Sequence, residues 1–175
     1  SKRKIYGAKV ALIGEVNAGK SSLFNCLVDM ERAIVSSIAG TTRDVIEKSV
    51  YIQGLEICFF DTAGKRDSST DEIEIQGMNF GTEIMNDMDA IILVVDPKQI
   101  NQNILKQLIS KIECSCMVVF THADILASDH SIYNIPPALQ KFPQFSISSK
   151  TGEGIEELKN GLFHMLFQRE TDRKS

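Results

Sequence analysis

The segment Gly14–Ser21 has the spacing G-x-x-x-x-G-K-S, which in proteins holds the phosphates of a nucleotide. An apolar run, Val10–Ile13, precedes it and is predicted to be a buried strand, and a helical pattern over Ser21–Val28 follows it. Backbone N–H groups of such a loop converge on phosphate oxygens, helped by the positive end of the helix. Lys20 would then reach the β- and γ-phosphates, and the Ser21 hydroxyl would bind Mg²⁺. The segment predicts a nucleoside triphosphate site.

Two further segments carry groups suited to the same phosphates. Asp61-Thr62-Ala63-Gly64 follows an apolar strand, where Asp61 suits a Mg²⁺-associated carboxylate and Gly64 a backbone N–H for the γ-phosphate. Thr41 and Thr42 lie in an irregular stretch, and a threonine hydroxyl there completes the Mg²⁺ shell only when γ-phosphate is present. The alternative for Asp61–Gly64 is a simple turn without a ligand, and the alternative for Thr41 and Thr42 is a common turn-plus-cap arrangement.

The base is expected to lie at the ends of two later strands. Thr121-His122-Ala123-Asp124 ends the predicted strand 117–120. A carboxylate there accepts both the N1–H and the N2–H₂ of guanine, and adenine lacks that donor pair, so Asp124 predicts selection of guanine. Ser148, Ser149 and Lys150 end the last strand and would frame the base from the other side.

Apolar runs that alternate with helical patterns must position these groups. The predicted strands are 10–13, 45–53, 55–60, 90–95, 117–120 and 145–148, and the predicted helices are 21–28, 73–85, 100–112 and 153–168. This alternation predicts an α/β domain with a mostly parallel six-stranded sheet flanked by helices. The two strands around Gly54 are expected to form a hairpin. The last helix is expected to turn Ile155, Leu158, Leu162, Phe163, Leu166 and Phe167 inward.

Length and composition narrow the function classes. The 175 residues fit one domain, and a net charge of −4 argues against tight nucleic-acid binding by this segment alone. No apolar run approaches the roughly 20 residues that cross a membrane, and no signal peptide is visible. The four cysteines lack metal-ligand spacing and are expected to be free thiols in a reducing cytoplasm. We expect an excised domain over 9–169, with 1–8 as linker or added residues and 170–175 as a polar tail.

Five motifs in this order, each at the carboxyl end of a strand, resemble the translation-factor-like GTPases over the whole chain. More narrowly, segments 17–22, 38–44, 61–64 with 71–77, and 148–154 resemble the G domain of the tRNA-modification GTPases of the MnmE (TrmE) family, within the TrmE/Era/Der group. The resemblance implies a P-loop GTPase fold. It also implies slow hydrolysis of GTP to GDP and phosphate, stimulated by potassium and by G-domain dimerisation.

The resemblance also assigns residues. The implied GTP-binding residues are Asn17, Ala18, Gly19, Lys20, Ser21, Ser22, Ser36, Thr41, Thr42, Asp61, Gly64, Thr121, His122, Asp124, Ser148, Ser149 and Lys150. The implied catalytic residues are Lys20, Thr42, Gly64 and Glu74, and the implied Mg²⁺ ligands are Ser21, Thr42 and Asp61.

Potassium is implied where other GTPases use an arginine finger. Ras-type GTPases place a glutamine after Asp-x-x-Gly, whereas this chain has Lys65. In the resembled family a K⁺ ion offsets the charge that develops between the β- and γ-phosphates. Its implied ligands are the Asn17 side chain and the backbone carbonyls of Ser36 and Ile38. Glu74 would orient the attacking water; the alternative is a solvated acid at a helix start.

Two departures from the family pattern stand out. Thr121-His122 replaces Asn-Lys, which removes an amide that links the base to the P-loop and an aliphatic stem that packs on the base. A histidine ring can stack on guanine instead. We therefore predict weaker nucleotide binding with guanine selectivity kept. Glu15-Val16 stands where the family often has Arg-Pro, at variable loop positions.

The resemblance implies partners as well. It predicts a homodimer of GTP-bound G domains, further domains of a full-length protein, a partner protein in tRNA wobble-uridine modification, and contact with tRNA only through domains not in this chain. It predicts no membrane and a cytoplasmic location. Two alternatives stay open: a ribosome-assembly GTPase of the Era or Der kind, and a module that holds nucleotide with little hydrolysis.

Overall fold

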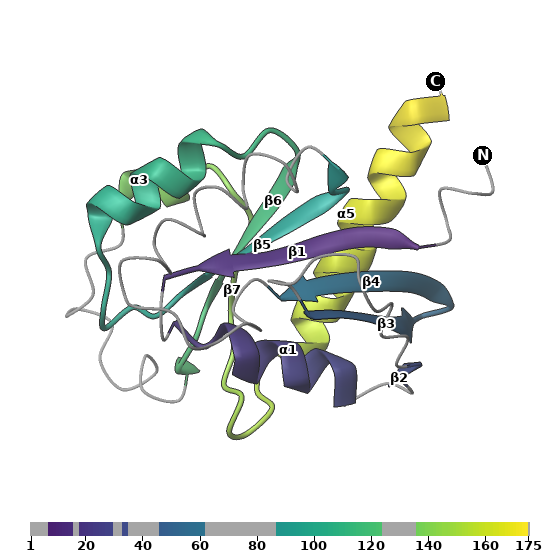
Figure 1. The fold of residues 1–175 in the computed structure, drawn as a ribbon, viewed down its shortest axis with the longest axis horizontal. Coiled ribbons are helices and arrows are strands. Elements are labelled where there is room, and N and C mark those ends of the chain that lie inside the picture. The colour runs from purple at the N-terminus through teal and green to yellow at the C-terminus, as the bar shows by residue number, and fades with distance from the viewer. Residues whose placement is uncertain are drawn as a thin grey trace.

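Seven strands form one sheet in the computed structural model, which describes residues 7–15, 18–29, 33–34, 46–61, 87–123 and 136–174. The strands are β1 (Ala8–Gly14), β2 (Ala33–Ile34), β3 (Ile46–Ile52), β4 (Leu55–Asp61), β5 (Ala90–Val95), β6 (Ser115–Phe120) and β7 (Gln144–Ser146). Their order across the sheet is β2-β3-β4-β1-β5-β6-β7 (Figure 1). The predicted α/β fold with a mostly parallel sheet is confirmed, and all six predicted strands are present.

The seventh strand is a departure from the prediction. Ala33 and Ile34 fall in a stretch expected to be irregular, yet they pair antiparallel with Val50 and Ser49 of β3. Two residues carry too little periodic pattern to be recognised as a strand, because alternation needs about four residues to show. The strand therefore depends on the edge of β3 that it covers.

β3 and β4 form the expected hairpin. They pair antiparallel over their whole length, from Ile46 with Asp61 to Ile52 with Leu55. Gln53 and Gly54 connect them, and both have positive φ, 52° and 81°. That is the geometry of the two-residue turn that suits the twist of paired strands.

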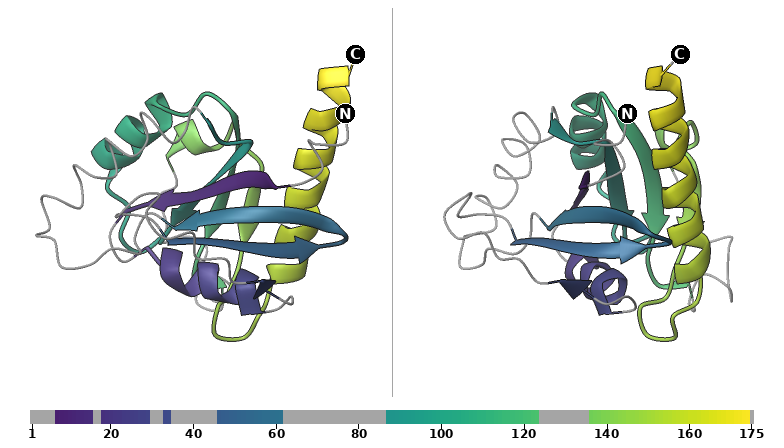
Figure 2. Two further views of the ribbon diagram at one scale, coloured as in Figure 1. Left: turned by 45° about the vertical axis from the view of Figure 1, so that its right-hand side comes forward. Right: turned by 90° about the vertical axis from the view of Figure 1, so that its right-hand side faces the viewer.

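The helices cover opposite faces of the sheet. α1 (Lys20–Asp29) and α5 (Ile155–Lys174) pack in one apolar core, and α3 (Gln102–Ser110) packs in the other (Figure 2). β5 is buried along its whole length, as a central parallel strand covered on both faces must be. Asn101 caps α3 by accepting the Ile104 N–H at 3.2 Å, and a short 3₁₀ helix, η4 (Pro137–Leu139), precedes β7.

The last helix differs from its prediction in two respects. It continues to Lys174 rather than ending at 168, through the segment expected to be a tail. Ile155, Leu158 and Leu162 are fully buried as predicted, whereas Phe167 is 57% exposed. The ring of Phe167 stacks on Phe163 at 5.8 Å along the outside of the helix. The inward assignment of Phe167 was wrong because this ring lies beside the buried face of the helix, whereas its neighbour Leu166 is buried in the core as predicted.

All four cysteines are free thiols, as expected. Burial raises the pKa of Cys58 to about 12, and that of Cys116 likewise. Such thiols remain protonated and act as small core residues. Among the described residues, no helix is long and apolar enough to cross a membrane.

Candidate functional site

The carboxyl ends of four parallel strands bring the predicted site together at one edge of the sheet. β1 lies between β4 and β5, with Leu12 opposite Asp61 and Gly14 opposite Val94. β6 follows β5, with Phe120 opposite Val95. Loops that leave such an edge form the usual ligand crevice of open α/β sheets. The P-loop, Asp61 at the end of β4 and the first residues after β5 and β6 therefore share one edge of the described part of the molecule.

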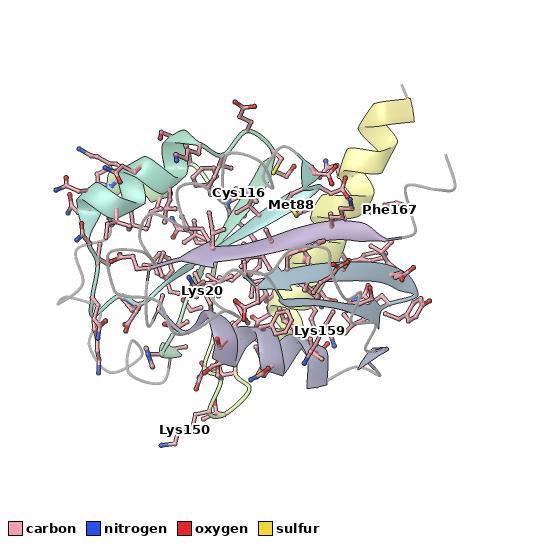
Figure 3. All side chains as sticks on the ribbon, viewed as in Figure 1. Lys20, Met88, Cys116, Lys150, Lys159 and Phe167 are labelled. Carbon is pink, nitrogen blue, oxygen red and sulfur yellow. The ribbon has the colours of Figure 1, made fainter. Side chains whose placement is uncertain are left out.

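Lys20 lies buried at the centre of this edge (Figure 3). Its Nζ donates to the Gly14 carbonyl at 2.8 Å, so the side chain folds back over the loop that precedes it. Burial lowers the pKa of the Lys20 ammonium to about 8, although the carboxylates of Asp61 and Glu15 oppose that shift. A buried cation on a loop of backbone N–H groups is a site for an anion.

The oxygen groups expected to hold Mg²⁺ are a buried carboxylate and an exposed hydroxyl. Asp61 ends β4 and is 2% exposed, and Ser21 is an exposed residue in the first turn of α1. Magnesium takes oxygen ligands and keeps several waters, so one carboxylate and one hydroxyl beside phosphates suit it. The donor set fits Mg²⁺.

Thr121 links β6 to the P-loop. Its hydroxyl donates to the Ala18 carbonyl at 3.0 Å and lies 3.4 Å from the Val95 carbonyl. A Cβ on Gly19 would lie 2.9 Å from the Thr121 methyl, so the loop and the strand end are in van der Waals contact. The expected loss of a link at this position is thus only partial, because the threonine hydroxyl still ties the strand end to the loop.

His122 follows in an unusual backbone conformation. Its φ is 63°, and its Nε2 lies 3.7 Å from Oδ2 of Asp96. Asp96 is the residue after β5 and is nearly buried. Asp96 is not among the predicted site residues, although its position directly after a buried strand, like that of Asp61, was an available signal.

The predicted base loop is a compact turn between β7 and α5. The Ser148 backbone N–H donates to the Glu153 carbonyl at 2.9 Å, and the Ser148 hydroxyl accepts the Thr151 N–H at 3.2 Å. Ser148 is buried, whereas Lys150 is exposed and extends away from the body (Figure 3). The Cys26 thiol of α1 contacts the Ser149 carbonyl at 3.8 Å. The loop therefore lies against the helix that follows the P-loop.

Glu15 makes a contact that the sequence did not indicate. Its carboxylate accepts the backbone N–H of Asn101, the cap of α3, at 3.0 Å. A variable P-loop position thus joins the loop to the segment that connects β5 with α3.

The family model described as 50S ribosome-binding GTPase matches residues 9–122, more than half of the chain. The chain belongs to this GTPase family. The match begins in β1 and ends at His122, so it contains the P-loop, Asp61 and Thr121. Membership supports guanine-nucleotide binding and GTP hydrolysis, with Mg²⁺ expected.

Individual relatives of this GTPase domain carry a more specific name. The chain is 36% identical over 174 residues, 99% of its length, to "tRNA modification GTPase MnmE" of Chlamydia pneumoniae. It is 40% identical over 161 residues to the MnmE of Prochlorococcus marinus. The chain spans 37% of the first relative and 34% of the second. The resemblance inferred from the motifs is confirmed.

Solved structures give the same fold for the GTPase domain. The cytosolic domain of the T. maritima FeoB iron transporter in a GDP form has a TM-score of 0.67 at 29% identity. That alignment covers 91% of this chain and 63% of the FeoB chain. The G domain of T. maritima FeoB has a TM-score of 0.63 at 28% identity, with 93% and 98% covered.

Several predicted site residues lie outside the described part of the GTPase domain. These are Asn17, Ser36, Ile38, Thr41, Thr42, Gly64, Glu74 and Asp124, together with Lys65 and the predicted helix 73–85. The predicted potassium ligands and water-orienting acid belong to this group, and their roles stay predictions.

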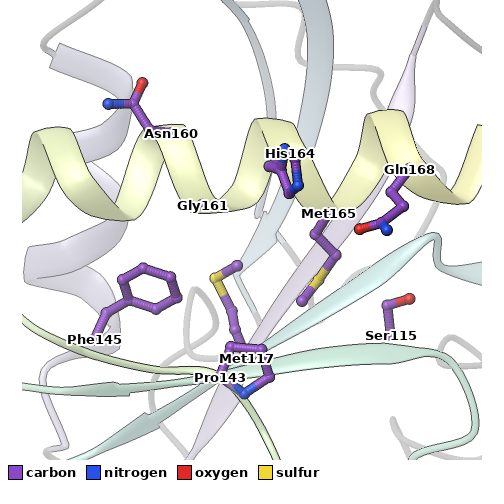
Figure 4. Close-up of a pocket in the computed structure, with 9 residues that line it drawn as sticks. All are labelled: Ser115, Met117, Pro143, Phe145, Asn160, Gly161, His164, Met165 and Gln168. Atoms are coloured by element: carbon purple, nitrogen blue, oxygen red, sulfur yellow. The ribbon is translucent and has the colours of Figure 1, made fainter.

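A cavity of about 780 Å³ lies elsewhere, between α5 and the β6–β7 edge (Figure 4). Met117, Phe145 and Met165 line it, and Ser115 at the start of β6 closes one end. Thr121, which donates to the Ala18 carbonyl of the P-loop, directly follows the opposite end of β6. None of the predicted nucleotide-binding residues lines this cavity.

Proposed function

We propose that this domain binds GTP and hydrolyses it to GDP and phosphate at the carboxyl edge of the sheet. The observation that carries the proposal is the buried Lys20 ammonium, held on the P-loop beside the carboxylate of Asp61. Burial of an ammonium away from water costs free energy unless an opposite charge pairs with it. A bound triphosphate would supply that charge. The hydrogen bond from Thr121 to the same loop supports the proposal that the base segment lies next to the phosphates.

Metal ions belong to the proposal. Ser21 and Asp61, with Thr42, would hold Mg²⁺, and Asn17 with the carbonyls of Ser36 and Ile38 would hold K⁺. Bound there, the two cations would offset negative charge on the phosphates. Glu74 would orient the attacking water, and the Gly64 N–H would donate to the γ-phosphate.

Guanine selection is assigned to Asp124. Replacing Asp124 with Asn removes the acceptor pair for the N1–H and N2–H₂ of guanine. We expect GDP affinity to fall at least a hundredfold, because buried donors are left unpaired. Titration of a fluorescent GDP analogue measures the change, and Asp87→Asn on the opposite edge serves as the matched control. Unchanged guanine binding in Asp124→Asn would contradict the assignment.

The biological role follows from the relatives named tRNA modification GTPases. We propose that the domain belongs to a longer cytoplasmic protein that acts with a partner protein in wobble-uridine modification. GTP-bound domains would pair across the nucleotide face, and contact with tRNA would come from other domains. The family description favours a second candidate, a ribosome-assembly GTPase.

Potassium-dependent turnover tests the proposal. GTP hydrolysis is measured at high protein concentration in KCl and in NaCl, for the natural chain, for Asn17→Ala and for the exposed control Asn103→Ala on α3. We expect potassium to stimulate hydrolysis in the natural chain and in Asn103→Ala but not in Asn17→Ala. Equal, negligible rates in both salts with GTP bound would indicate instead a module that holds nucleotide without hydrolysing it.

A further inference from the structure

Two strand ends meet beside the P-loop and bring a carboxylate to an imidazole. β5 and β6 are parallel, with Val95 opposite Phe120, so the residues after them leave the sheet side by side. The Oδ2 of Asp96 lies 3.7 Å from the Nε2 of His122. The Asp96 side chain is 6% exposed and the His122 side chain 46% exposed. A nearly buried carboxylate thus faces an imidazole that a ligand can still reach.

The Asp96 carboxylate is itself held in place. Its Oδ1 accepts the Lys98 backbone N–H at 3.0 Å, and its carbonyl accepts the Gln99 N–H at 3.0 Å. Because one carboxylate oxygen is engaged in this turn, the backbone sets the position of the other, which faces His122. The segment between Asp96 and α3 also contacts the P-loop, because the Glu15 carboxylate accepts the Asn101 N–H.

The backbone of His122 is also held. Its φ of 63° is uncommon for a residue other than Gly, although His, Asn and Asp adopt it more often than the rest. Hydrogen bonds on both sides maintain it, from the Thr121 N–H to the Val95 carbonyl at 2.9 Å and from the Ala123 N–H to the Ile147 carbonyl at 2.8 Å. An unusual conformation that its surroundings maintain is a feature of functional sites.

We infer that Asp96 is a positioning residue that holds the imidazole of His122 for stacking on the guanine base. This rests on the proposed function, because the guanine nucleotide is the ligand against which His122 acts. At 3.7 Å the contact is longer than a hydrogen bond, and a charge attraction between the two groups requires a protonated imidazole. A ring held in advance loses less side-chain freedom when the base binds.

Nucleotide affinity in a double-mutant cycle tests the inference. A fluorescent GDP analogue is titrated at pH 6 into the natural chain, Asp96→Asn, His122→Ala and the double variant. We expect each single change to weaken binding roughly three- to tenfold, the size of one aromatic stacking contact. The double variant should bind no more weakly than His122→Ala. Asparagine still accepts the Lys98 N–H, so the turn survives, and Asp87→Asn, at an exposed carboxylate before β5, should bind like the natural chain.

The signals of the imidazole protons supply a readout that a merely structural role would not move. The chain has three histidines, so the His122 signals are identified by their loss in His122→Ala. We expect GDP to shift them through the ring current of the base, and the shift to be smaller in Asp96→Asn. The inference is overturned if Asp96→Asn costs as much affinity without His122 as with it, or if GDP leaves the His122 signals in place. If the natural chain binds no GDP, the proposed function fails instead.

Discussion

Lys20 is the residue at which function and stability oppose each other. Lys20 is 6% exposed, and burial lowers the pKa of its ammonium to about 8. The folded protein without ligand therefore carries a cation that would be better solvated in the unfolded chain. A bound phosphate group reverses the balance, because it supplies negative charge inside the site.

Replacement of Lys20 by Met should separate these effects. We expect the unfolding free energy of the nucleotide-free protein to rise by roughly 1–2 kcal/mol at pH 7, since the charge penalty disappears and one hydrogen bond to the Gly14 carbonyl is lost. GTP affinity should fall by at least a hundredfold. Urea unfolding and nucleotide titration measure the two quantities. Lys106→Met on the exposed side of α3 is the control and should change neither.

The stability difference should also depend on pH. A lowered lysine pKa means that the unfolded chain binds the proton more tightly than the folded protein. The penalty is therefore full below about pH 8 and disappears as pH rises from there towards 10.5. The advantage of Lys20→Met in unfolding free energy should therefore shrink steadily between pH 7 and pH 10 and can change sign, because the lost hydrogen bond remains. A constant difference over that range would show that the Lys20 charge is not the cause.

Thr121 supports the site through its hydroxyl. Thr121→Val keeps the methyl that contacts Gly19 but leaves the Ala18 carbonyl without this donor. We expect a loss of about 1–2 kcal/mol in unfolding free energy and weaker GDP binding, because the P-loop is less firmly held. Thr121→Ser keeps the hydroxyl and should retain most of both. If the valine and serine variants behave alike, the hydroxyl does not hold the loop.

The junction between β7 and α5 supports the base loop. Gly152 and Gly154 both have positive φ, 84° and 82°. A Cβ on Gly154 would lie 2.0 Å from the Ser146 carbonyl oxygen, whereas nothing lies within 4 Å of one on Gly152. The two glycines have the same backbone conformation but differ in the room available for a Cβ atom. Replacing each with alanine therefore separates the two effects.

We expect Gly154→Ala to destabilise the protein by more than about 3 kcal/mol, because backbone must move to admit the methyl group. Gly152→Ala should cost only about 1 kcal/mol, the strain of an L residue in that conformation. Urea unfolding measures both. Equal losses in the two variants would mean that conformation alone, and not the close approach of β7, requires glycine at residue 154.

Two apolar cores lie on opposite faces of one sheet. α5 contributes Ile155, Leu158 and Leu162 to the larger core together with α1, which begins at Lys20. The helix that covers the sheet thus also supports the helix at the phosphate site. Leu166 of the same helix also belongs to this core, whereas Phe167 beside it lies outside.

Leu162→Ala should lower the unfolding free energy by about 2–5 kcal/mol, because it leaves a cavity at a fully buried position. Phe167→Ala, on the same helix, should cost less than about 1 kcal/mol, since this side chain is mostly exposed and stacks on Phe163 at the helix surface. Chemical unfolding followed by circular dichroism measures both. A loss at Phe167 as large as that at Leu162 would show that the Phe167 ring also packs in the core.

The sequence alone determined the local chemistry and the class of fold. The P-loop spacing, the apolar runs of β1 and β5 and the periodicity of α5 depend on neighbours in the chain, so each could be predicted before any contact was known. Asp61 was found for the same reason, because it follows a buried strand.

The contacts between these segments became known only from the tertiary structure. The bond from Thr121 to Ala18, the pairing of Asp96 with His122 and the contact of Glu15 with Asn101 join residues that are distant in sequence. The strand register that brings them together is set by packing of the whole sheet, and no local pattern encodes it. The exposure of Phe167 next to the buried Leu166 was likewise decided by which face of α5 packs on the sheet.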